Sequence, residues 1–177
     1  MFRFLIVALS IFPISSWGGP TQTCTHALEI WANKGAPMSE VIPALKIGAR
    51  DGDAGCAAFV GVALSNIDYG RESNYSTDPR EGYRYLKQAA LDSYELAEGI
   101  KKDVFYWLGR AYFDGKPVLQ NFKIAYSWFS LAAALDDARS SAMRDRTFYM
   151  LRQAGLADGV QEFAVRCKSS PKLCLPE

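Results

Sequence analysis

The sequence contains a single histidine, His26, among its 177 residues. A metal site built from several imidazoles is therefore excluded, and any Ser-His-Asp or Cys-His arrangement would have to use that one side chain. An excess of charge is also missing, because 20 Lys and Arg stand against 19 Asp and Glu. Nucleic-acid binding needs surplus cations to neutralise phosphates, so no nucleic-acid partner is expected.

Two motifs of cofactor chemistry are absent as well. The cysteines show no CxxC spacing, and no Gly-rich phosphate-binding loop occurs. We therefore expect no metal, no redox-active cysteine pair and no cofactor. His26 lies in an amphipathic stretch with Ala27 and Leu28, which is more typical of a packed or surface histidine than of a catalytic one.

Residues 1–18 have the pattern of a secretory signal peptide. Arg3 supplies the positive start, an apolar stretch follows over residues 4–14, and Ser16 and Gly18 are small residues before a cleavage site. The apolar stretch is shorter than the roughly 20 residues that span a bilayer. We expect cleavage near Gly18, a periplasmic or secreted protein, and no direct membrane insertion after cleavage. An uncleaved N-terminus would instead tether the chain to the inner membrane.

Export gives the four cysteines a structural role. In an oxidising compartment, Cys24, Cys56, Cys167 and Cys174 can form two disulfides in three connectivities. We favour Cys24 with Cys56, which ties the N-terminal segment to a helix, and Cys167 with Cys174, which closes a short loop.

A repeat runs through the rest of the chain. Five residues recur 43 positions later with similar chemistry, which predicts stacked helix pairs, because a period near 40 residues is typical of helical arrays. The first copy is Asp78, Tyr83, Tyr85, Ala89 and Ala90, and the second is Asn121, Tyr126, Trp128, Ala132 and Ala133. No β-strand signal of comparable strength appears, so the fold should be all-α.

Helix start and stop signals support this interpretation. Asp78 is placed to cap a helix that begins at Pro79, and Glu81 can reach back to the cap. Asn121 takes the cap position in the second copy. The preceding helix, around residues 104–114, should end at Gly115.

The second copy resembles the Sel1-like repeats, which are relatives of the tetratricopeptide repeats. The matching residues are Leu108-Gly109-x-x-Tyr112-x-x-Gly115-x-x-Val118-x-x-Asn121-x-x-x-Ala125-x-x-Trp128-x-x-x-Ala132-Ala133. The chain departs from the family pattern at Asn121 and Asp136, where Asp and Gly are usual, and by extra residues in 67–77 and 98–103. The resemblance implies a right-handed solenoid of antiparallel helix pairs. Residues 19–177 would form one domain, with about three pairs and a C-terminal capping helix.

The resemblance also implies a function. Sel1-like proteins are typically non-enzymatic adaptors, and many bacterial members are exported. We therefore expect an interaction module that binds a specific protein partner in the periplasm, as a scaffold or regulator. Small exported relatives also act as immunity proteins that neutralise a secreted toxin, and this alternative stays open, as does the identity of the partner.

The candidate binding residues come from helical spacing. One face of the helix around residues 104–114 carries Val104, Leu108, Ala111, Tyr112 and Gly115. The opposite face carries Tyr106, Arg110 and Phe113, which have the composition of an interface hot spot. Alternatively this face packs on a neighbouring helix, and its aromatics are core. Arg144 and Phe148 are expected to extend the same surface.

A hydrolase that uses paired carboxylates is the less favoured alternative. Asp51 with Asp53 and Asp136 with Asp137 are adjacent enough in sequence to be considered. Each pair, however, lies where a helix should begin or end, and acidic residues are ordinary there. Substituting Asp51 and Asp53 would silence an enzyme and leave a binding module intact.

Overall fold

The computed structural model describes residues 22–65 and 76–176, and within them every regular element is helical. The elements are α1 (Gln22–Lys34), α2 (Met38–Arg50), α3 (Ala54–Ser65), α5 (Pro79–Leu91), α6 (Glu98–Asp114), α7 (Phe122–Ala133), α8 (Ala138–Gln153) and α9 (Val160–Ser169), with short 3-10 turns η2 (Ser93–Glu95) and η3 (Pro171–Cys174). The expected all-α fold is confirmed. The proposed signal peptide lies outside the described residues.

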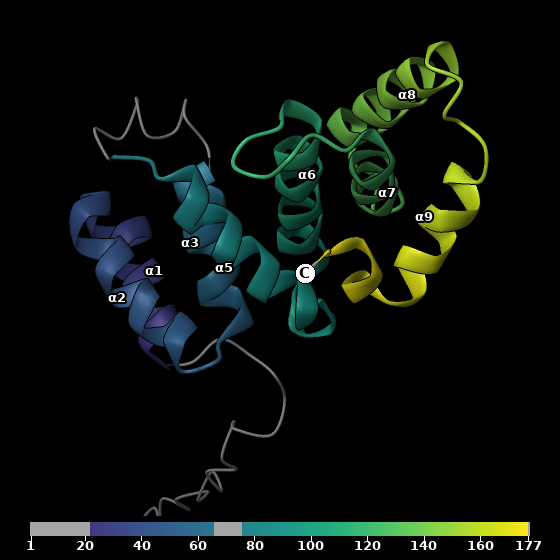
Figure 1. Ribbon diagram of the computed structural model, residues 1–177. Helices are drawn as coiled ribbons and strands as arrows, with labels where there is room; N and C mark the ends of the chain where they lie inside the picture. Colours follow the sequence, from purple (N-terminus) through teal and green to yellow (C-terminus); the bar gives the residue numbers. More distant parts are fainter. Residues whose placement is uncertain (1–21, 66–75, 177) are drawn as a thin grey trace, which may run out of the picture.

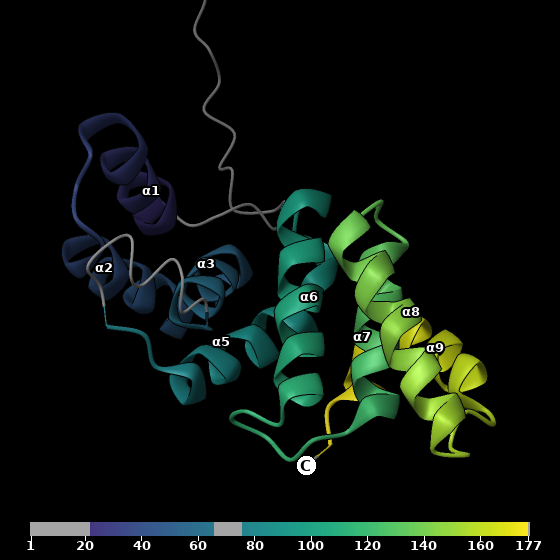
Figure 2. The ribbon, with the colours of Figure 1, turned by 90° about the horizontal axis from the view of Figure 1, so that it is seen from above.

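The helices stack along the chain as an array (Figure 1). α3 pairs with α5 and α6 pairs with α7, while α6 also packs on α3 and α5. At the N-terminal end α1 lies on α2, and at the C-terminal end α8 and α9 both pack on α7 (Figure 2). The C-terminal segment then returns to α5 and α7 through η3.

The predicted helix boundaries follow from local capping. Asp78 accepts hydrogen bonds from the backbone N–H of Arg80 and Glu81, at 3.0 and 3.1 Å. Asn121 accepts from the N–H of Ile124 at 3.1 Å. Gly115 ends α6 in the left-handed conformation, with φ of 68°, which a residue without a Cβ adopts at little cost.

One capping expectation is wrong. The Glu81 side chain does not reach back to the cap but accepts a hydrogen bond from Lys46 Nζ at 2.7 Å. This ion pair joins α2 to α5, so the acidic side chain at the start of α5 fixes the position of a neighbouring helix rather than closing its own first turn.

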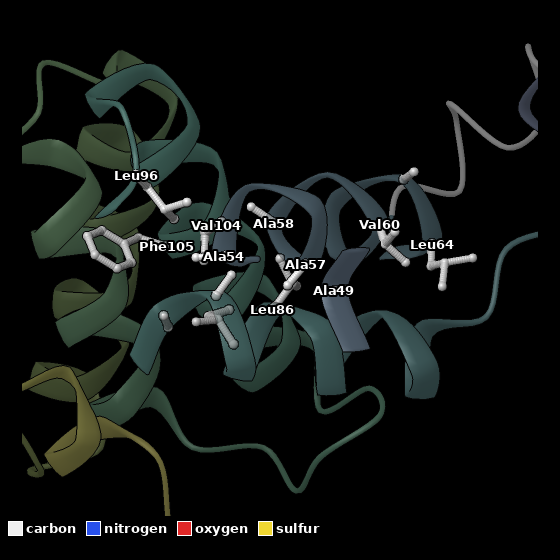
Figure 3. Packing of buried hydrophobic residues seen from close by; sticks show 14 of the residues in the cluster. Ala49, Ala54, Ala57, Ala58, Val60, Leu64, Leu86, Leu96, Val104 and Phe105 are labelled. Carbon is white, nitrogen blue, oxygen red and sulfur yellow. The ribbon is translucent and has the colours of Figure 1, made fainter. Parts of the chain in front are cut away.

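Small residues allow the helices of a pair to approach closely. Between α3 and α5 the core consists of alanines with occasional larger side chains such as Leu64 and Leu86 (Figure 3). In α7 the repeat alanines Ala125 and Ala132 are completely buried beside Trp128. The recurrent alanines of the sequence therefore mark helix–helix contacts, because a methyl group keeps the two backbones close.

A partly buried tyrosine pair links the two helix pairs. The hydroxyls of Tyr83 in α5 and Tyr112 in α6 lie 2.7 Å apart and share a hydrogen bond, with the rings edge to face. Burial raises the pKa of both phenols, and the shared hydrogen bond raises that of Tyr112 further. Both groups therefore stay neutral at physiological pH, and this link between repeats does not respond to pH in that range.

The cysteines pair in the connectivity favoured from the sequence. Cys24 bonds to Cys56, which joins α1 to α3, and Cys167 bonds to Cys174, which joins α9 to η3. All four are completely buried. Asp53 lies beside the first pair, but cysteines bonded to each other cannot supply thiolates to a metal. Among the described helices, none is long and apolar enough to cross a membrane.

Candidate functional site

The two faces of α6 have different environments. Val104, Leu108 and Tyr112 lie on the face expected to be buried, and each is at most 2% exposed. The opposite face, with Tyr106, Arg110 and Phe113, is half-buried. Other residues of the chain therefore partly cover this second face.

The aromatic rings of the second face pack on α7. The centroids of Tyr106 and Phe113 lie 6.0 and 6.2 Å from that of Phe129, which is completely buried, and Phe113 also contacts Phe122 at 5.5 Å. These contacts support the alternative interpretation in which the two rings belong to the core.

Two arginines of α8 cover the same rings. The guanidinium of Arg139 lies 4.7 Å from the centre of the Tyr106 ring, and that of Arg146 lies 5.4 Å from the centre of Phe113. Each pair is 33 residues apart in sequence, so α8 runs parallel to α6, one repeat later. Sequence reasoning missed both arginines, although their seven-residue spacing matches that of the two aromatics.

Ion pairs fix these cationic side chains. Arg139 contacts Asp103 at 2.5 Å and Asp137 at 3.1 Å, and Arg110 contacts Asp114 at 2.8 Å. Burial raises the pKa of Asp137, but hydrogen bonds from Ser140 and the Arg139 ion pair outweigh burial and lower it below its usual value. The stabilisation from this ionised cap is therefore present above the ordinary pKa of an aspartate and is lost as acid protonates it.

Arg144 and Phe148 lie elsewhere, in a groove of about 480 Å³ between α7, α8 and α9. The Phe148 ring lies 5.7 Å from Tyr126 of α7, and Arg144 pairs with Asp145 at 2.8 Å. Ten residues line this groove: Tyr126, Ser130, Leu131, Arg144, Asp145, Phe148, Gln161, Ala164, Val165 and Lys168. The expectation that Arg144 and Phe148 extend the α6 surface is therefore wrong, because residues 144 and 148 project from a different side of α8 than residues 139 and 146.

One carboxylate of each pair considered for hydrolysis caps the start of a helix. Asp53 is buried and accepts a hydrogen bond from the N–H of Cys56 at 2.7 Å, whereas Asp51 is exposed. Asp137 caps α8 by accepting from the N–H of Ser140 at 3.1 Å. His26 is exposed on α1. These positions agree with the interpretation that the acidic pairs lie at helix ends for structural reasons.

Substitutions on α6 distinguish core residues from surface residues. Tyr106→Ala should lower the free energy of unfolding by about 2 kcal/mol, because it removes a half-buried ring that packs on Phe129 and lies under Arg139. Arg110→Ala should cost less than about 1 kcal/mol, because it removes a partly exposed ion pair with Asp114, one turn away, and a long hydrogen bond of 3.3 Å to the Tyr106 hydroxyl. Urea unfolding of the two variants measures the difference, and equal losses would show that the ring is not part of the core.

The comparisons with known proteins agree with this architecture. The family model of the Sel1 repeat matches residues 61–94 and 106–137. The first match runs from α3 through α5, and the second from α6 through α7 to the cap of α8. No curated protein and no solved structure matches the chain. Sel1 repeats are generally protein–protein interaction modules and typically non-enzymatic scaffolds. The chain therefore contains two Sel1 repeats, which coincide with two of its stacked helix pairs.

Proposed function

We propose that the chain is an exported, non-enzymatic module that binds one specific protein partner in the periplasm, as a scaffold or regulator. The observation that carries this proposal is the pair of Sel1 repeats packed into one array. Repeat arrays present extended surfaces built from several helices, and such surfaces suit the recognition of another protein.

The disulfides support export. Disulfides form and persist in secreted and periplasmic proteins and are rare where thiols are kept reduced. Both pairs here are completely buried and hold terminal helices, as expected of structural bonds. The pattern of residues 1–18 agrees with the same destination.

Binding is favoured over catalysis by the positions of the polar residues. Asp53 and Asp137, which a carboxylate-dependent hydrolase would use, each satisfy backbone N–H groups at a helix start. Of the five binding residues proposed from the sequence, Arg144 and Phe148 line an open groove. Tyr106 and Phe113 are largely occupied by contacts within the array. We therefore propose the groove as the principal contact surface.

Affinity capture from the cell envelope tests the function. The full chain with a C-terminal tag should recover one protein in stoichiometric amount, and Asp51→Asn should recover the same protein, because binding does not need that carboxylate. Failure to recover any stoichiometric partner would contradict the binding function.

The dissociation rate then separates the two roles. An inhibitor of a toxic enzyme needs a complex that persists for hours, whereas a scaffold exchanges within seconds. A partner that kills cells when expressed alone and dissociates slowly would establish the immunity role. A harmless partner that exchanges quickly would establish the scaffold or regulator.

A further inference from the structure

The groove between α7, α8 and α9 has an apolar floor and one exposed apolar wall residue. Tyr126 and Leu131 of α7 are at most 8% exposed, and Phe148 of α8 is half-buried beside them. On the α9 side, Ala164 is small and buried, whereas Val165 is 66% exposed. The volume of about 480 Å³ lies in the range of pockets that bind ligands of moderate size. An apolar side chain of a partner would gain by covering this floor and Val165.

The charged residues of the groove are predominantly cationic. Arg144 and Lys168 line it together with one acidic residue, Asp145. Asp145 is already engaged, since Arg144 donates to its Oδ1 from Nε at 2.9 Å and lies at 2.8 Å through Nη2. Lys168, in contrast, has no carboxylate within ion-pair distance in the part of the chain that the structure describes. The charge complement of this groove is therefore a carboxylate supplied by the ligand.

The α9 wall of the groove is held in place before any ligand binds. The disulfide between Cys167 and Cys174 closes the end of α9 next to Lys168, and the indole Nε1 of Trp128 donates to the carbonyl of Cys174 at 3.2 Å. These bonds hold α9 and η3 against α7. A preformed site loses little conformational freedom on binding, which favours recognition of a short segment.

We infer that this groove binds a peptide segment of the partner protein in which a large apolar side chain is followed or preceded by carboxylates. The apolar side chain lies on Leu131, Phe148 and Val165, and a carboxylate pairs with Lys168. This inference rests on the proposed binding function and adds to it the position of the site and the chemistry of its ligand.

Selection from a library of random dodecapeptides displayed on phage tests the inference. Against the full disulfide-bonded chain, the selected peptides should share an aromatic or leucine residue beside Asp or Glu. Lys168→Glu should weaken the selected peptides about tenfold or more, because it replaces attraction by repulsion. Arg166→Glu is the matched control: it makes the same charge change in the same last turn of α9, and residue 166 does not line the groove. Its effect should stay within about twofold.

Any one of four outcomes would overturn the inference. Selected peptides could lack the acidic–apolar pattern, or Lys168→Glu and Arg166→Glu could weaken them equally. Sedimentation could instead show a dimer that Lys168→Glu dissociates, in which case a second copy of the chain occupies the groove. Capture of the envelope partner distinguishes this inference from the proposed function. If Lys168→Glu still binds the partner, the binding function holds and the groove is not the site. If the native chain binds no partner, the function itself is wrong.

Discussion

Trp128→Ala is expected to lower the free energy of unfolding by about 3–5 kcal/mol. Trp128 is completely buried in α7, and its ring lies 5.4 Å from Phe105 of α6. Its indole N–H also donates to the carbonyl of Cys174. The substitution therefore leaves a cavity between α6 and α7 and also removes the hydrogen bond that ties η3 to α7. Because domains are stable by only about 5–15 kcal/mol, much of the variant should be unfolded under mild conditions.

Trp128→Phe separates the two contributions. It keeps most of the ring but leaves the Cys174 carbonyl without the indole donor, which should cost about 1–3 kcal/mol. Urea denaturation of both variants, with the disulfides intact, gives the comparison. Loss of less than about 1 kcal/mol for Trp128→Ala would contradict the central role of this side chain in the packing of α7.

Gly61→Leu is expected to prevent stable folding. A Cβ at Gly61 would lie 2.8 Å from the backbone nitrogen of Leu86, and one at Gly82 would lie 3.0 Å from that of Ser65. α3 and α5 therefore meet through their backbones at two glycines. Even Gly61→Ala should cost about 1–3 kcal/mol, because backbone atoms cannot rotate away as a side-chain end can. A leucine at this position must separate the two helices.

Gly99→Ala is the matched control for this experiment. Gly99 also lies in a helix, but no heavy atom from beyond its chain neighbours and its own helical backbone would come within 4 Å of its Cβ. Alanine there should leave stability unchanged or raise it by up to about 1 kcal/mol, because it restricts the unfolded chain. Thermal unfolding followed by circular dichroism reports all three variants. Similar melting temperatures for Gly61→Leu and the native chain would contradict the close approach of α3 and α5.

Features governed by local backbone chemistry could be predicted from the sequence. The caps at Asp78 and Asn121 and the left-handed Gly115 depend on residues within one turn, so the sequence pattern is enough to identify them. The disulfides were also predictable, because export and one short loop limited the connectivities.

Contacts between repeats could not be predicted in the same way. Arg139 and Arg146 cover Tyr106 and Phe113 only because α8 runs parallel to α6 at a particular height. Helical spacing shows which residues share a face of one helix, but it does not show which helix covers that face. For the same reason Arg144 and Phe148 were assigned to the wrong surface, and Lys46 was not recognised as the partner of Glu81.

Photo-crosslinking in living cells tests the binding function and its location most directly. A photoreactive amino acid replaces either Val165, which lines the groove, or the adjacent Arg166, which does not. We expect one protein adduct from position 165 in the periplasm and little or none from position 166. An adduct from position 166 alone would support the binding function but contradict the groove as its site. If the chain is folded and exported, the lack of an adduct from either position would contradict a partner bound in this groove. If the envelope capture also recovers no stoichiometric partner, the protein-binding function itself is contradicted.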